Sequence, residues 1–280
     1  VTATLTGELD HRPGFQNRCF YGFGNALLLT GDRKYIDVWR DMVEAVNANK
    51  IHVGGKDMYP HMFGDSGWYD YTEEKFSEGN LELYYWSMSP EDLNRLEPVD
   101  WIDFLQGKNR TYPVETLRRD IALVYKKIDK MRNDISTPDT RLSDDPNEIN
   151  PATVGSLIKL MLGGLPTGRI GFPLHCRVRY FDPERQRAGI PEDVASLVEE
   201  MTDDEVVLTL VNIGRKESRD VIVQGGAYAE HFLVNILIGD HMYKINDTHV
   251  MLRLNPGCGA RISLKMKRYA SKPILKFPWW

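Results

Sequence analysis

The chain has 280 residues, of which 42% are hydrophobic and 27% are charged, and its formal net charge is -5. This composition excludes wholesale disorder and supplies enough apolar side chains for a sizeable core in one large or two modest domains. The slight acidic excess gives no bulk attraction for nucleic acid or an anionic membrane surface, and no apolar run approaches the ~20 residues that span a bilayer. We therefore expect a soluble protein with no nucleic-acid or membrane partner.

The first predicted elements are two helices joined by a tight turn. Residues 20–29 form a small apolar segment that ends at Thr30-Gly31, where a glycine favours helix termination. Asp32 can cap a second helix that runs to Val46. Its apolar side chains recur three and four positions apart, at Ile36, Trp39, Val43 and Val46. The sequence predicts an antiparallel helix hairpin.

Residues 61–78 crowd carboxylates, phenols, an indole and an imidazole around Gly64 and Gly67. Because the polar residues follow neither helical nor strand spacing, we interpret the segment as a loop that presents side chains. Flat aromatic faces beside acids suit a sugar ring, although a packed aromatic loop with solvated acids fits equally well. The candidate catalytic residues are His61, Asp65, Tyr69 and Asp70, and the candidate substrate-binding residues are Trp68, Tyr71 and Glu78.

Three further helices are predicted downstream. Residues 81–86 form one, followed by Ser89-Pro90, where the serine can cap a new helical turn and proline suits its first position. The longest predicted helix runs from Pro113 to Asp134, with an apolar stripe made of Leu117, Ile121, Val124, Ile128 and Met131. Residues 151–162 give one more, with Val154, Leu157, Ile158 and Met161 on its expected buried side.

After a breaker-rich boundary at residues 163–173, the pattern changes to short runs of branched residues separated by turns. These runs predict at least five antiparallel strands, at residues 205–211, 220–223, 232–238, 249–254 and 260–266. A further strand at 174–180 would place His175, Arg177 and Arg179 on one face, as candidate substrate-binding residues or as a salt-bridged interdomain strand. The expected fold class is α+β, with a helical domain over residues 1–170 and a β-sandwich over 171–280.

The phrase from Tyr21 to Asp37, which contains Thr30-Gly-Asp32 followed by Lys34-Tyr-Ile36, resembles the helix hairpin of (α/α) toroid enzymes that act on carbohydrates. Such enzymes often carry an antiparallel β-sandwich after the toroid. The resemblance implies ten to twelve helices in all, roughly twice the number predicted here. Together with the start at Val1, this deficit leads us to expect a fragment or processed subunit whose N-terminal half is either missing or supplied by a second polypeptide.

Two reaction types draw on the same candidate residues, and neither needs an organic cofactor. Glycoside hydrolysis requires two carboxyl groups across the scissile bond, for which Asp65 and Asp70 are the first choice. Polysaccharide elimination requires a base and an acid such as His61 and Tyr69, with Arg177 or Arg179 neutralising a uronate. The hydrolase is preferred to the lyase, and a non-catalytic glycan-binding or scaffold subunit is the competing class.

Other clusters give weaker indications. His11 lies in an early loop and is a candidate ligand or base, although a plain surface position is preferred. A turn-rich acidic segment contains Asp139, Asp144 and Asp145, for which capping and turn roles are preferred to calcium binding. The three cysteines show no metal-ligand spacing, so no metal site is expected. The apolar end at Phe277-Pro-Trp-Trp280 is expected to dock on its own domain.

Overall fold

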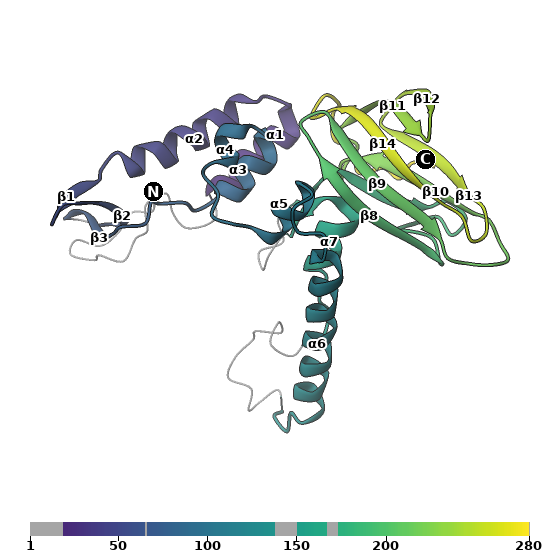
Figure 1. Cartoon of the computed structure of the whole chain (residues 1–280), viewed down its shortest axis with the longest axis horizontal. Coiled ribbons are helices and arrows are strands. Elements are labelled where there is room, and N and C mark those ends of the chain that lie inside the picture. The colour runs from purple at the N-terminus through teal and green to yellow at the C-terminus, as the bar shows by residue number, and fades with distance from the viewer. Residues whose placement is uncertain (1–18, 65, 138–149, 167–172, 280) are drawn as a thin grey trace.

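The computed structural model describes residues 19–64, 66–137, 150–166 and 173–279 (Figure 1). The candidates His11, Asp65, Asp139, Asp144 and Asp145 lie outside these residues. In the described part, helices precede a region made of antiparallel sheets, so the chain has an α+β fold. The division into domains at residue 170 stays a prediction. None of the described helices is long and apolar enough to cross a membrane.

The predicted helix hairpin is confirmed by α1 (Cys19–Thr30) and α2 (Lys34–Asn47). The expected stripe of α2 is fully buried, with Ile36, Trp39, Val43 and Val46 each at most 7% exposed. Gly31 turns the chain between the helices at a φ of 69°, and a Cβ there would lie 2.3 Å from the carbonyl oxygen of Tyr269. Asp32 does not cap α2 as the N-cap residue, but its carboxylate accepts a hydrogen bond from the Lys34 amide.

The prediction of a loop over residues 61–78 is wrong for its first half. This part belongs to a three-stranded antiparallel sheet, which we call the hairpin sheet, made of β1 (Ile51–Val53), β2 (Lys56–Gly64) and β3 (Gly67–Thr72). Gly67 adopts a φ of 93° beside the turn, where Gly64 and Gly67 pair, so the glycines serve the hairpin rather than breaking the strands. The aromatic residues on either side of the glycines, such as Phe63, Trp68 and Tyr69, favour strands.

The middle helices are α3 (Asn80–Ser87), α4 (Pro90–Leu93), α5 (Asp100–Leu105) and α7 (Gly155–Leu162). The Ser89 cap is confirmed, because its side chain accepts a hydrogen bond from the Asp92 amide and Pro90 opens α4. The expected buried side of α7 is wrong in part. Val154 and Leu157 are exposed, whereas Ser156 and Leu160 are the buried residues of this helix.

The long helix α6 (Tyr112–Arg132) confirms the predicted element but not the burial of its stripe. Only Tyr112 and Thr116 are buried, both in the first turns, while Ile121 and Met131 are 55% and 46% exposed. Figure 1 shows why: beyond its first turns α6 extends away from the other helices and from the sheets. Periodicity placed the apolar residues on one face, but no described element packs along that face.

Two antiparallel sheets dominate the C-terminal part, which we call the β region. One has the strand order β13-β10-β6-β7 and the other β12-β11-β14-β9-β8. Side chains from both sheets, including Val223 of β10 and Leu208 of β9, join the same hydrophobic cluster. The strands of these two sheets are β6 (Val178–Asp182), β7 (Arg187–Ala188), β8 (Val194–Met201), β9 (Glu205–Asn212), β10 (Arg219–Gly225), β11 (Phe232–Ile238), β12 (His241–Asp247), β13 (His249–Leu254) and β14 (Gly259–Lys267).

The five strands predicted from branched residues are confirmed as β9, β10, β11, β13 and β14, whereas β8 and β12 were not predicted. The expected strand at 174–180 divides into β5 (His175–Cys176), which pairs with β4 (Gly164–Leu165), and β6. The C-terminal end docks on its own β region, as predicted. Phe277 and Trp279 stack on each other at 5.0 Å between ring centroids, and both rings meet Phe181 edge-on.

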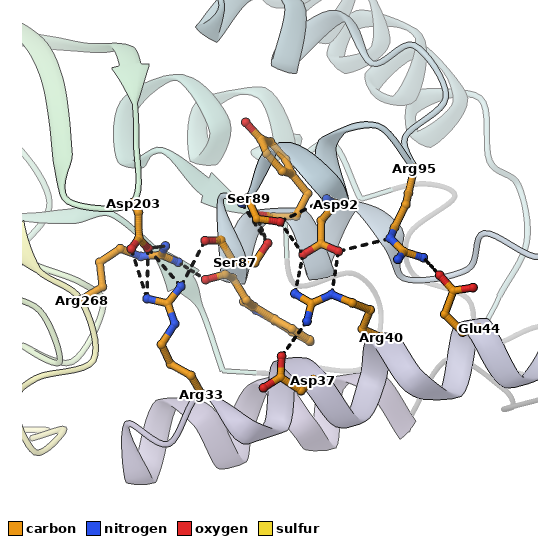
Figure 2. Close-up of polar contacts among 12 residues, drawn as sticks. Arg33, Asp37, Arg40, Glu44, Ser87, Ser89, Asp92, Arg95, Asp203 and Arg268 are labelled. Carbon is orange, nitrogen blue, oxygen red and sulfur yellow. Dashed lines mark hydrogen bonds and ion pairs between the residues drawn. The ribbon is translucent and has the colours of Figure 1, made fainter.

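Arginines hold the helices against the β region (Figure 2). Nη2 of Arg268 donates hydrogen bonds of 2.8 Å to the carbonyl oxygens of Tyr85 and Trp86, and Nη1 donates to Asp203 at 2.7 Å. Arg33 from the start of α2 reaches the same Asp203 and the Ser87 carbonyl. These carbonyls end α3, where the helix dipole favours cations. We call this set of contacts the junction.

Candidate functional site

The hairpin sheet and the chain that follows it form a pocket of about 870 Å³, which we call the hairpin pocket. It brings together four of the residues singled out in the sequence, namely His61, Tyr69, Asp70 and Glu78. Glu74 and Thr72 also line it, with Met62 and Phe76 as its apolar parts and Ser77 beside them. Figure 1 shows the hairpin sheet at one end of the molecule and the β region at the other.

Strand pairing sets the positions of these side chains. Met62 of β2 pairs with Tyr69 of β3, which places the neighbouring His61 and Asp70 at the same level of the hairpin. Nε2 of the half-buried His61 lies 3.0 Å from the Glu74 carbonyl oxygen and 2.9 Å from the Thr72 hydroxyl oxygen, so the imidazole is anchored. Asp70 is exposed and adopts a left-handed φ of 57°, a conformation that aspartate tolerates better than most residues.

The described lining of the hairpin pocket carries three carboxylates, Asp70, Glu74 and Glu78, and contains no arginine or lysine. A fourth carboxylate lies close enough to interact with Glu78. The pKa of Glu82, in the first turn of α3, is raised by burial and further by the charge of Glu78. The pKa of Tyr21 is raised by burial and then by Glu82 and Glu78. The pocket therefore favours neutral or cationic ligands over anions.

Sequence reasoning missed Glu74, Glu82 and Tyr21. A usable signal existed for Glu82, because it follows Glu78 by four positions at the start of a predicted helix, where two acids can face each other. Tyr21 lies on the distant helix α1, and only the tertiary structure brings it near Glu78 and Glu82.

The aromatic candidates Trp68 and Tyr71 do not line the hairpin pocket. The Trp68 ring packs edge-on against Phe63 across the hairpin at 4.9 Å between centroids. Tyr71 is half-buried and pairs with Pro60. Among the aromatic candidates only Tyr69 contributes to the lining, and its hydroxyl group is buried.

The predicted strand face of His175, Arg177 and Arg179 is not part of this pocket. His175 is buried against Trp86, and burial together with Arg268 lowers its pKa to about 4. Arg179 donates a hydrogen bond of 2.8 Å to the Ala227 carbonyl and lines a different cavity beside Phe277. Because β5 and β6 are separate strands, the three side chains do not form one continuous face.

Arg177 has no exposed surface, and none of its guanidinium nitrogens has a hydrogen-bond partner in the described part of the chain. The guanidinium carbon lies 5.4 Å from the ring centre of Tyr85. Burial, with a contribution from Arg268, lowers the pKa of Arg177 to about 9. The alternative of a salt-bridged interdomain strand is therefore also wrong for this residue: within the described ranges it makes no ion pair.

No three histidine, cysteine, aspartate or glutamate residues of the described chain are arranged to hold a metal ion. No family model, curated protein or solved structure matches the chain at a significant level. The functional argument therefore rests on the hairpin pocket itself.

Proposed function

We propose that this chain is a carbohydrate-active enzyme that hydrolyses a neutral oligo- or polysaccharide with carboxylate acid/base catalysis. The observation that carries the proposal is the hairpin pocket, which combines several carboxylates, an anchored imidazole and a tyrosine, with no arginine or lysine in its described lining. Neutral sugars offer hydroxyl groups to such acids and apolar ring faces to Tyr69 and Phe76.

The pair of Glu78 and Glu82 supplies the acid and the base. Glycosidases need one carboxyl group that stays protonated and one that stays ionised, and environments that push two pKa values apart produce this division. Glu82 lies beside Glu78 rather than in the described lining, and its raised pKa favours the protonated form, so we assign it the general acid. Glu78 lines the pocket and acts as the base or nucleophile, while Asp70 and His61 hold sugar hydroxyls.

The charge of the pocket argues against the lyase. Elimination beside a uronate requires a cation or amide to neutralise the sugar carboxylate, and the proposed donors were Arg177 and Arg179. Both lie elsewhere, one buried at full depth and the other beside Phe277. A uronate in the hairpin pocket would meet Asp70, Glu74 and Glu78 without a neutralising arginine or lysine in the described lining.

The proposal extends to the fold. The helix hairpin of α1 and α2, followed by further helices and then two antiparallel sheets, agrees with part of an (α/α) toroid that precedes a β-sandwich. In this proposal a second polypeptide completes the helical ring and closes the substrate site over Glu78 and Glu82.

The test is release of reducing sugar from neutral polysaccharides such as β-glucan, mannan and xylan, with alginate and polygalacturonate as anionic comparisons. We expect turnover of a neutral substrate, and we expect Glu78→Gln and Glu82→Gln each to lower kcat at least ~100-fold. Glu73→Gln is the matched control, because Glu73 forms an ion pair with Lys56 and does not line the pocket. Turnover of uronates alone would contradict the hydrolase and restore the lyase.

Glycan binding without turnover is the alternative outcome. Saturable binding of a neutral oligosaccharide, weakened by Asp70→Asn and never followed by sugar release, would identify a binding subunit. Absence of both binding and turnover would refute the assignment of the hairpin pocket.

A further inference from the structure

A second, smaller pocket of about 370 Å³ lies where α5, α6 and the α7 helix meet; we call it the basal pocket. The buried rings of Trp101 and Tyr112 form one part of its lining. Charged groups of both signs line the rest: Asp100, Arg119, Asp120 and Lys159. A buried hydrogen bond of 2.9 Å between the Thr116 and Ser156 hydroxyls joins α6 to α7 beside it.

The four charged side chains line one pocket without forming ion pairs among themselves or with other described residues. Within the described residues, none of Asp100, Arg119, Asp120 or Lys159 forms an ion pair within 4 Å. The Oδ2 atom of Asp120 is buried and has no hydrogen-bond partner in the described chain. A buried acceptor without a partner is costly, so a donor that reaches this oxygen would stabilise the site.

Lys159 is likewise partly buried at this pocket and has no ion-pair partner among the described residues. Its Nζ lies 5.7 Å from the ring centre of Trp101, and burial lowers its pKa while Asp120 acts in the opposite direction. Burial raises the pKa of Tyr112, a hydrogen bond with Thr116 opposes this, and the charges of Arg119, Asp100 and Asp120 make smaller contributions. Asp120 and Lys159 are half-buried, whereas Asp100 and Arg119 are exposed at the mouth of the pocket.

We propose that the basal pocket binds a small zwitterion of the α-amino acid class. Its ammonium group would meet Asp100 and Asp120, and its carboxylate would meet Arg119 and Lys159. A simple dianion would be repelled by the two aspartates, a polyamine would be repelled by Arg119 and Lys159, and a neutral sugar would leave all four charges unmatched. The site is separate from the hairpin pocket, and the proposal does not depend on the hydrolase.

The experiment is isothermal titration of the full chain with single α-amino acids from glycine to tryptophan. We expect saturable binding of at least one, and a loss of at least about tenfold in affinity for its methyl ester, which lacks the carboxylate, and for its N-acetyl form, which lacks the ammonium. Absence of saturable binding across the series, or equal binding of the blocked forms, would overturn the proposal.

Variants assign the binding to this pocket. Asp120→Asn and Lys159→Met should each weaken the bound amino acid at least about tenfold, whereas Lys126→Met, on the exposed part of α6, should leave affinity unchanged. Thermal unfolding of each variant shows that it is folded. If a variant unfolds, Arg119→Gln provides the test on an exposed side chain. Unchanged affinity in folded variants would place the binding elsewhere and refute the basal pocket.

Discussion

The helices beside the junction and the hairpin pocket place carboxylates in different surroundings, with arginine partners in the first case and in a ligand-sized pocket in the second. Beside the junction, between α2 and α4, Asp92 is fully buried and accepts hydrogen bonds of 3.0 and 2.8 Å from Arg40, with Arg95 also within ion-pair distance (Figure 2). Burial acts to raise the pKa of Asp92, but hydrogen bonds from Arg40 and Ser87 outweigh it and lower the pKa. The hairpin pocket groups three carboxylates, and its described lining contains no arginine or lysine. Carboxylates that pair with arginines hold elements together, whereas carboxylates that line a pocket can contact a ligand.

The largest expected effect comes from removing the matched carboxylate. We expect Asp92→Ala to lower the free energy of unfolding by about 3–5 kcal/mol, because Arg40 and Arg95 lose a buried partner. Urea denaturation measures it. Asp37→Ala is the control: Asp37 also contacts Arg40 but is exposed, so its loss should cost less than ~1 kcal/mol. Equal losses in both variants would remove the distinction between buried and exposed partners.

Arg177 contrasts with the paired Asp92, because its buried guanidinium has no hydrogen-bond or ion-pair partner among the described residues. We expect Arg177→Met to raise the free energy of unfolding by about 1–3 kcal/mol, since an apolar chain of similar volume needs no counter-charge. Arg268→Met, which removes three hydrogen bonds at the junction, should lower it by at least ~1.5 kcal/mol. A large loss in the Arg177 variant would mean that an acceptor outside the described residues neutralises the guanidinium.

Two buried groups of the C-terminal part, Glu230 and His175, make the free energy of unfolding depend on pH in opposite directions. Burial raises the pKa of Glu230 from 4.5 to about 7. The contribution of Glu230 to the free energy of unfolding is therefore largest below pH 4.5 and is lost as the pH rises to 7. Burial lowers the pKa of His175 from 6.5 to about 4. The contribution of His175 to the free energy of unfolding is therefore largest above pH 6.5 and is lost as the pH falls to 4. Between pH 4.5 and 6.5 the two effects oppose each other.

Glu230→Gln removes one of these effects. We therefore expect the unfolding free energy of this variant to rise with pH between 4.5 and 6.5 more steeply than that of the unmodified chain, by about 2 kcal/mol across the window. Denaturant titrations at several pH values provide the measurement. Parallel pH profiles would show that Glu230 is not protonated in the folded protein.

The smallest expected effect belongs to the hairpin pocket. Asp70→Asn should change the free energy of unfolding by less than ~0.5 kcal/mol, because the side chain is exposed and asparagine also tolerates the left-handed backbone. Asp70→Ala should cost about 1–2 kcal/mol for the same backbone reason. Denaturation of the two variants separates backbone strain from charge. If both cost the same, the conformation of Asp70 is not what distinguishes them.

Local chemistry made much of the helical and strand content predictable. The stripe of α2, the Ser89 cap and the five branched-residue strands each depend on neighbours within a few positions, and all were identified. The hairpin sheet was missed because its aromatic residues are interleaved with acids and its glycines looked like breakers. In the structure Gly64 and Gly67 pair beside the turn, so their position in the hairpin mattered more than their average preference.

Part of the candidate site could also be predicted, since His61, Tyr69, Asp70 and Glu78 lie close in sequence and one hairpin with its following segment gathers them. Residues from distant elements could not be assigned in this way. Tyr21 approaches Glu82 through the packing of α1 near α3, and Arg177 ends in the core rather than in a substrate site.

The sequence by itself determined most of the helices, five strands of the β region and the apolar stripe of α2, because these follow from short-range backbone and side-chain preferences. The tertiary structure alone decided which of those sides are covered. The helices α2 and α6 have comparable apolar stripes, yet that of α2 is buried and that of α6 is largely exposed beyond its first turns. Burial depends on whether another element packs against a face, and residue spacing within one helix carries no record of that partner.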